Sequence, residues 1–397
     1  MRILVNATTA VAGGAAQVAA TFIQNAVANP CRHEFHFAVS DLVAQNVLSL
    51  LGSAPARMSV VTPTPARILT GWRARRRLRL IEEQFQPDII YSIAAPSYVR
   101  FRQNEVARFT NPWVTHPNRW ARRALSVSRR VYARMLFLHK LLWLSRITYY
   151  VAQTETAARG LARRVKCPDE NIRVIPNCHN PLFHRGAPTC VRKDAPLILV
   201  LAFPYRHKHL TIVPDVAARL VRWGMKPRFI MTMPAEYGET ARVIAKARRL
   251  GVAECIENVG RLSLSECARW YHECDVFFLP TLLETFSVSY LEAMASGIPL
   301  VTTDLDFARD VCGEAACYFP PLSAEAAAEA IRSLLVDEDS YQRHVERGLR
   351  RVEQFPTSQE QYLMHVQWLE EVVNRLRAGS TAGCCLDSSG LAPKELL

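Results

Sequence analysis

The sequence contains no unbroken apolar run of the about 20 residues that a membrane-spanning helix requires. Its 11 cysteines are odd in number, scattered and without a C-x-x-C pair, so neither a zinc site nor a disulfide framework is indicated. Asn6, Thr8 and Thr9 interrupt the apolar region that a signal peptide would need. These absences favour a protein of the reducing cytoplasm whose first residues form a strand.

The size and composition are typical of a soluble enzyme with two domains. The chain has 397 residues, which is more than one hydrophobic core usually serves. Hydrophobic residues make up 49% and charged residues 21%, as in ordinary globular proteins. Residues 1–190 hold 26 Lys and Arg against 9 Asp and Glu, whereas residues 191–397 hold 23 against 27. The net charge of +13 therefore resides in the first half.

Short apolar segments alternate with helical patterns in both halves, which predicts two parallel sheets with crossover helices. In the first half, strands are expected at Ile3–Ala7, Phe35–Val39, Met58–Val61, Ile89–Ser92, Trp113–Thr115 and Thr148–Ala152. In the second half they are expected at Leu197–Ala202, Arg228–Met233, Cys255–Val259, Val276–Leu279, Leu300–Thr302 and Cys317–Phe319. We expect a Rossmann-like domain at 1–180, a linker at 181–193, a second Rossmann-like domain at 194–355, a helix at 356–378 and a disordered tail at 379–397.

The segment 275–303 carries the most specific signal. Its first six residues predict a buried strand, and from Phe286 onward apolar residues recur on one helical face. A helix N-terminus at the carboxyl edge of a parallel sheet can bind phosphate through its free N–H groups. Glu284 precedes this helix and Glu292 lies within it, so two carboxylates flank the predicted phosphate site. Such acceptors suit the hydroxyl groups of a sugar nucleotide.

The stretch that begins at Glu284 resembles the E-x7-E signature of the retaining family-4 glycosyltransferases, the glycosyl transferases group 1. The most specific part is Leu-Glu-Ala-Met-Ala-x-Gly-x-Pro at 291–299. The resemblance implies the α/β GT-B fold, with two Rossmann-like domains facing each other across a cleft. It also implies that Glu284 contacts the transferred sugar and that Glu292 contacts the nucleotide ribose. The family loop usually reads Glu-Gly-Phe-Gly, and both of its glycines are replaced here.

Other positions match the family outside this helix. Gly13 and Gly14 follow the first strand, where glycines let the backbone approach donor phosphates. Lys208 matches the lysine that serves the diphosphate, and Arg206 stands near the place of a missing family arginine. His116 follows a predicted strand, although a lone histidine is as often structural. The resemblance assigns Glu284, Lys208 and His116 as catalytic residues, Gly13, Gly14, Arg206, Thr285, Phe286, Ser287, Val288 and Glu292 as donor-binding residues, and no metal ligand.

The resemblance implies transfer of a glycosyl group from a nucleotide sugar with retention of configuration. Lys208, the amides of the glycine pair and the helix start would stabilise the leaving diphosphate. Because these groups take the place of a divalent ion, we expect no cofactor and metal-independent activity. By analogy with bacterial relatives, the expected acceptor is a lipid-linked glycan or a surface polysaccharide of the cell envelope.

Two arginine-rich segments, 71–79 and 119–146, interleave Trp and Leu with Arg at helical spacing. This pattern is typical of helices that bind an anionic membrane surface, which would make the protein peripheral on the inner face of the membrane. Two ordinary helices packed on the first sheet explain it equally well. Nucleic acid is not expected as a partner, because no readout motif accompanies the charge.

Two alternative functions share the predicted fold. A catalytically silent protein that binds nucleotide sugars is compatible with the replaced glycines and the missing arginine. A sugar-nucleotide epimerase is also compatible with the fold, but the E-x7-E context argues against it.

Overall fold

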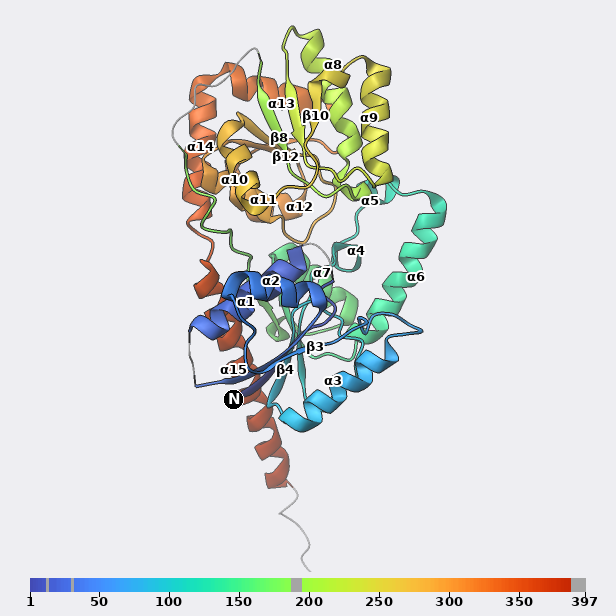
Figure 1. Ribbon diagram of the computed structural model, residues 1–397, viewed down its shortest axis with the longest axis vertical. Helices are drawn as coiled ribbons and strands as arrows, with labels where there is room; N and C mark the ends of the chain where they lie inside the picture. The colour runs from blue at the N-terminus through green and yellow to red at the C-terminus, as the bar shows by residue number, and fades with distance from the viewer. Residues whose placement is uncertain (12–13, 30–31, 187–194, 387–397) are drawn as a thin grey trace, which may run out of the picture.

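The computed structural model has two domains, each built on one parallel sheet, as Figure 1 shows. It describes residues 1–11, 14–29, 32–186 and 195–386. The first sheet has the order β3-β2-β1-β4-β5-β6-β7 and the second the order β10-β9-β8-β11-β12-β13. The strands are β1 (Arg2–Ala7), β2 (Glu34–Val39), β3 (Met58–Val60), β4 (Ile89–Ser92), β5 (Glu105–Arg108), β6 (Tyr149–Ala152), β7 (Ile172–Val174), β8 (Leu197–Val200), β9 (Arg228–Met231), β10 (Ile256–Asn258), β11 (Val276–Leu279), β12 (Leu300–Thr303) and β13 (Ala316–Phe319).

Helices fill the connections between these parallel strands, as crossover topology requires. In the first domain they are α1 (Gly14–Ala28), α2 (Asp41–Leu51), α3 (Trp72–Phe85), α4 (Pro112–Thr115), α5 (Arg119–Arg123), α6 (Val127–Leu144) and α7 (Glu155–Val165). In the second domain they are α8 (Val213–Arg222), α9 (Gly238–Leu250), α10 (Leu264–Glu273), α11 (Val288–Ser296), α12 (Asp306–Cys312), α13 (Ala324–Val336) and α14 (Glu338–Val352), followed by α15 (Ser358–Leu386).

One expected strand is a helix, and two strands were not expected. Residues 113–115 belong to α4, because the Asn111 side chain caps that helix by accepting from the Trp113 N–H at 3.1 Å and Pro112 favours a first helical turn. β5 escaped prediction since two of its four residues are charged. β7 is a three-residue edge strand that is only half-buried.

Each sheet has its own hydrophobic core, and α15 belongs to the first. Tyr362, Trp368 and Leu369 of this helix are buried against the core that contains β1 and α1. The Tyr91 hydroxyl and His365 Nδ1 lie 2.8 Å apart across this contact. The final helix therefore returns to the first domain. It continues through Leu386, so the beginning of the segment 379–397, expected to be disordered, is helical. Most of the expected linker, residues 187–193, lies outside the described residues.

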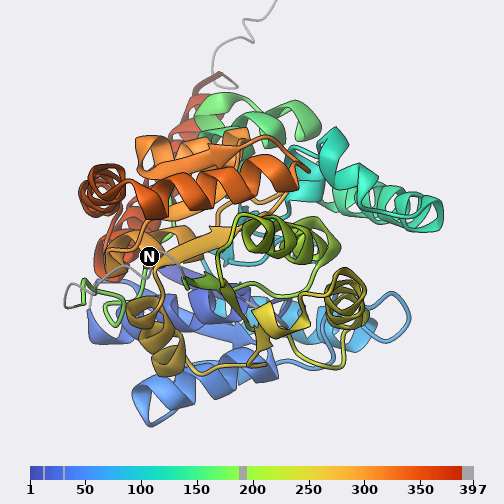
Figure 2. The ribbon, with the colours of Figure 1, turned by 90° about the horizontal axis from the view of Figure 1, so that it is seen from above.

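The two arginine-rich segments pack differently. α3 buries Ala74, Leu78 and Phe85 against the first sheet, as an ordinary surface helix does. α6 buries only Leu144 and extends from the side of the molecule, as Figure 2 shows. Within the described ranges, no helix combines the length and the apolar character needed to cross a bilayer.

Candidate active site

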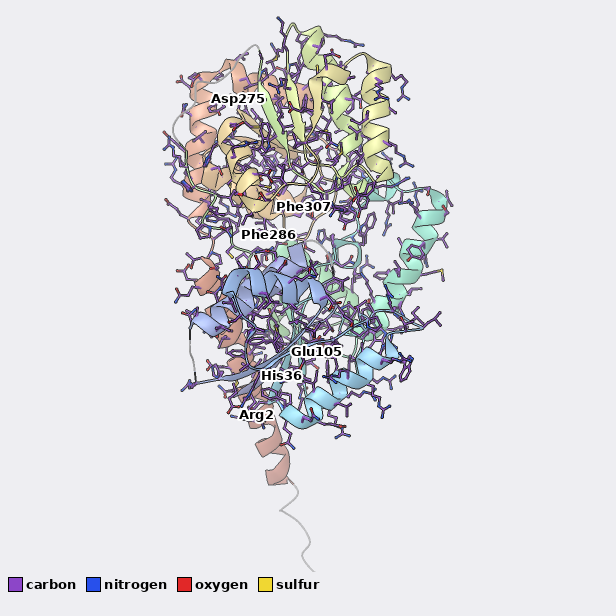
Figure 3. The ribbon with its side chains drawn as sticks, in the orientation of Figure 1. Arg2, His36, Glu105, Asp275, Phe286 and Phe307 are labelled. Carbon is purple, nitrogen blue, oxygen red and sulfur yellow. The ribbon has the colours of Figure 1, made fainter. Side chains whose placement is uncertain are left out.

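A cleft of about 880 Å³ separates the two domains. Because both sheets are parallel, the segments that follow their strands meet at this cleft. Gly14, Thr110 and Trp113 line it from the first domain, and Lys208 and the loop 284–289 line it from the second. In Figure 3, Phe286 and Phe307 lie at the level where the domains meet. The structure thus brings together most of the residues that the sequence motif assigned.

Lys208 and Glu284 form an ion pair in this cleft. Their side chains are only 15% and 12% exposed. Lys208 ends a short 3-10 turn, Arg206–Lys208, whereas Glu284 follows β11. The Thr281 hydroxyl donates to Glu284 Oε1 at 2.9 Å, so the carboxylate is held from two sides. Charged side chains that are already fixed in a partly desolvated cleft can bind a polar ligand without large movements of the protein.

His116 contacts the same loop but does not line the cleft in the described structure. It lies at the C-terminal end of α4 and not after a strand, as the sequence had suggested. Its Nε2–H donates to the Glu284 carbonyl at 2.6 Å, and its Nδ1 lies 2.7 Å from the Thr115 hydroxyl. Burial lowers the pKa of His116, which favours the neutral ring. The histidine therefore holds the backbone of Glu284 from the opposite domain.

More contacts fix the loop between Glu284 and α11. The Thr285 hydroxyl donates to the Thr110 carbonyl at 3.3 Å, and the Thr154 hydroxyl donates to the Thr285 carbonyl at 3.2 Å. The next residues, Phe286, Ser287 and Val288, line the cleft, and Ser287 is the N-cap of α11. The first N–H groups of a helix have no partner within it, so this end can bind an anion.

Gly14 is the first residue of α1 and lines the cleft from the other domain. A Cβ atom at this position would meet nothing within 4 Å, so the surroundings leave room for a ligand beside the backbone. Gly13 lies outside the described residues.

Glu292 is the fifth residue of α11 and turns toward α10, away from the cleft lining that the structure describes. The Tyr271 hydroxyl donates to Glu292 Oε2 at 3.1 Å. Burial raises the pKa of this carboxyl group to about 7. Glu292 is therefore placed beside Tyr271, and its contact with a ribose stays a prediction.

Arg206 does not reach the lining of the cleft in the described structure, and its contact with the donor stays a prediction. It faces Glu239 at 3.9 Å and the Ala124 carbonyl at 3.5 Å. Arg261, in the loop after β10, lines the cleft instead, although its guanidinium also pairs with Glu236 at 2.5 Å. Arg261 was not predicted as a site residue, because its loop matches none of the family motifs.

Asp-x-Asp is the spacing of a metal-binding motif, and it occurs twice in the chain, at residues 304–306 and 337–339. Asp304 accepts two bonds from Arg309, at 2.8 and 3.1 Å, and Asp337 caps α14. In the part of the chain that the structure describes, no three His, Cys, Asp or Glu side chains gather to hold a metal ion. Metal independence stays a prediction.

Two family models match the chain over most of its length. The Glycosyltransferase Family 4 model matches residues 12–181, and the Glycosyl transferases group 1 model matches residues 195–337. The chain belongs to this glycosyltransferase family. Its E-x7-E segment lies within the second matched range.

Curated relatives match this chain over a shorter range. Glycogen synthase of Mycobacterium tuberculosis is 29% identical over 143 residues, which are 35% of this chain and 34% of the relative. D-inositol 3-phosphate glycosyltransferase 2 of Catenulispora acidiphila is 26% identical over 166 residues, 38% and 39% of the two chains. The match thus spans little more than a third of the length of these relatives.

Solved structures match nearly the whole chain. Sucrose-phosphate synthase from Thermosynechococcus elongatus has a TM-score of 0.71 at 15% identity, over 94% of this chain and all of the other. HepE from Anabaena, in complex with UDP and glucose, has a TM-score of 0.70 at 14% identity, with the same coverage. At such identities the likeness shows the fold alone. The GT-B fold, with two Rossmann-like domains facing each other across a cleft, is confirmed.

Proposed function

We propose that this protein transfers a glycosyl group from a nucleotide sugar to a hydroxyl group of a glycan, with retention of configuration. The observation that carries the proposal is the Lys208–Glu284 pair beside the N-terminus of α11, in the cleft between the domains. A cation and free N–H groups bind a diphosphate, and a carboxylate accepts hydrogen bonds from sugar hydroxyls.

Charge stabilisation would be the main source of catalysis. As the bond between sugar and diphosphate breaks, negative charge grows on the leaving group. Lys208 and the start of α11 would stabilise that charge from one domain and the start of α1 at Gly14 from the other. Because these groups supply the positive potential, we propose that no metal ion or other cofactor is needed.

His116 would act as a positioning residue in this reaction. Its bond to the Glu284 carbonyl joins the first domain to the loop that carries the catalytic carboxylate. Asn118 makes a similar bond, because its Nδ2 donates to the Leu282 carbonyl at 2.6 Å. The closed arrangement of the two domains would therefore set the position of Glu284 relative to an acceptor.

We propose a lipid-linked or surface-polysaccharide acceptor, and a cavity beside α6 supports the lipid-linked form. The inner face of α6, with Tyr132, Leu136 and Phe137, lines this largely apolar cavity of about 620 Å³. Trp113 and His207 line both this cavity and the cleft, so the two are adjacent. An apolar part of an acceptor could lie there while its hydroxyl group reaches the donor.

We also propose that the outer face of α6 binds an anionic membrane, which would place the protein on the inner, cytoplasmic face. Five apolar residues on one side of the helix are each at least half exposed: Val127, Val131, Met135, Leu138 and Leu142. Arg134 lies beside this stripe, and Arg76 and Arg77 of α3 are exposed in the same domain. Apolar side chains next to positive charge suit a surface of anionic lipid.

The proposed activity is tested with the purified full chain. A thermal-shift screen against UDP-, GDP- and dTDP-sugars should identify the donor, and NMR should then detect hydrolysis or transfer. Glu284→Gln and Lys208→Ala should each remove most turnover at saturating donor. Lys246→Ala breaks a comparable Lys–Asp pair with Asp215 elsewhere in the second domain and serves as the matched control. Wild-type turnover in both site variants would overturn the assignment. Nucleotide-sugar binding without turnover would favour the silent binding protein.

A further inference from the structure

Three neighbouring strands of the first domain each end in a polar side chain at the cleft. Arg108 is the last residue of β5, Gln153 follows β6 directly, and Asn177 lies three residues after β7. All three line the cleft, yet Arg108 and Gln153 are each only 1% exposed. They belong to the first domain, whereas Lys208 and α11 belong to the second.

Arg108 carries a buried charge that no carboxylate of the described residues balances. Its Nη2 donates to Asn177 Oδ1 at 2.6 Å, and its buried Nε has no hydrogen-bond partner in the described structure. Among the described residues, Tyr91, Cys178 and His365 interact with its charge, and none of them is a carboxylate. Burial lowers the pKa of the guanidinium group. Burying a cation without a partner anion destabilises the folded protein. The presence of Arg108 at this position therefore favours a ligand that supplies the anion.

Gln153 gives a second, independent observation. Its amide nitrogen and oxygen are both buried, and neither has a partner among the described residues. Its neighbour Thr154 donates to the Thr285 carbonyl, so Gln153 lies next to the loop that follows Glu284. Burying an amide without a hydrogen-bond partner destabilises the folded protein more than burying an apolar side chain of the same size. Glutamine at this position therefore favours a ligand that the amide binds.

We propose that Arg108 and Gln153 bind an anionic group on the acceptor, a carboxylate or a phosphate that lies beside a hydroxyl group. The guanidinium would pair with the anion, while Gln153 would donate through its NH2 group and accept from the hydroxyl. The acceptor is favoured over the donor because Lys208 and the start of α11, proposed to bind the diphosphate, belong to the second domain, and the first domain is proposed to add only the backbone at Gly14. This inference rests on the proposed function and narrows the acceptor to an acidic sugar or a phosphorylated sugar or polyol.

The test compares charged and neutral probes that share a ring. Calorimetry with the full chain, with and without saturating nucleotide, gives the dissociation constant of each probe. It compares D-glucuronate with D-glucose, and myo-inositol 1-phosphate with myo-inositol. We expect one charged probe to bind about tenfold more tightly than its neutral partner, as charge-assisted hydrogen bonds do. Preference for glucuronate alone identifies a carboxylate, and preference for the inositol phosphate alone identifies a phosphate.

Two variants and a control assign the preference to this site. Arg108→Gln and Gln153→Leu should both abolish it, whereas Arg100→Gln, which removes an exposed charge from the same domain, should not. Gln153→Leu should also raise the melting temperature or leave it unchanged, because it removes an unpartnered buried amide. If Arg108→Gln does not fold, Gln153→Leu decides alone.

The outcomes separate this inference from the proposed function. Equal binding of charged and neutral probes by the wild type, or a preference that survives in Gln153→Leu, overturns the anion site. Nucleotide binding without any anion preference overturns the anion site alone. Anion preference in a protein that binds none of the tested nucleotide sugars supports the site and counts against the proposed donor.

Discussion

Removing Lys208 should destabilise the second domain as well as stop the reaction. The Lys208–Glu284 pair is 15% and 12% exposed, so Lys208→Met leaves a largely buried carboxylate whose remaining described partner is the Thr281 hydroxyl. Breaking a buried pair on one side costs about 3–5 kcal/mol, and the residual exposure together with the threonine bond favours the lower end, about 3 kcal/mol.

Removing both charges should restore most of that stability. In Lys208→Met/Glu284→Gln, the amide keeps its contact with Thr281 and no unpaired charge is left. A double-mutant cycle should therefore give a coupling of about 2 kcal/mol between the two positions. Turnover should stay lost in the double variant, because the diphosphate still lacks its cation.

Urea unfolding at pH 7, followed by circular dichroism, measures the stability of the wild type, the two single variants and the double variant. Turnover of the donor is measured on the same four proteins. Additive losses, with a coupling below about 0.5 kcal/mol, would refute the argument that the cleft desolvates the pair. Recovery of turnover in the double variant would show that the pair acts only through stability.

Three other predictions follow from separate parts of the molecule. Burial raises the pKa of Glu292 from 4.5 to about 7, so between these pH values the folded protein keeps a proton that the unfolded chain releases, and the free energy of unfolding should fall as the pH rises from 4.5 to 7. Glu292→Gln should remove up to about 3 kcal/mol of that fall, measured by urea titration across this pH range. An unchanged pH profile in the variant would contradict the prediction. Transfer should survive EDTA and give an α-linked product from an α-linked donor by NMR; an inverted product, or activity restored only by Mn²⁺ or Mg²⁺, would disprove this. Replacing Arg76, Arg77 and Arg134 by Gln should weaken binding to phosphatidylglycerol vesicles, measured by sedimentation at low salt, by about 100-fold, at about 1 kcal/mol per charge. The same change at three exposed arginines of the second domain, Arg222, Arg248 and Arg249, should have little effect. Equal losses in the two variants would show that the arginines of the first domain act only through net charge.

Local sequence patterns were sufficient to predict the helices and strands whose apolar residues recur with a strong period. The second-domain strands appear within two residues of their expected bounds, because a buried parallel strand leaves a short apolar run between turn residues. α11 ends at Gly297, whose left-handed backbone suits a glycine at a helix end. Local patterns failed at α4, where a cap and a proline outweighed the strand propensity of Trp113–Thr115.

The sequence by itself determined the two parallel sheets, the family and the place of Glu284 and Lys208 in segments that follow strands. These features depend on residue order and on motifs only a few residues long. The tertiary structure alone decided which groups face each other across the cleft. It turned Arg206 toward Glu239, set Glu292 against Tyr271 and brought His116 to the Glu284 carbonyl, 168 positions away in the chain. It also gathered Arg108, Gln153 and Asn177 from three separate strand ends. Such meetings depend on how two sheets pack and dock, which no local pattern of residues encodes.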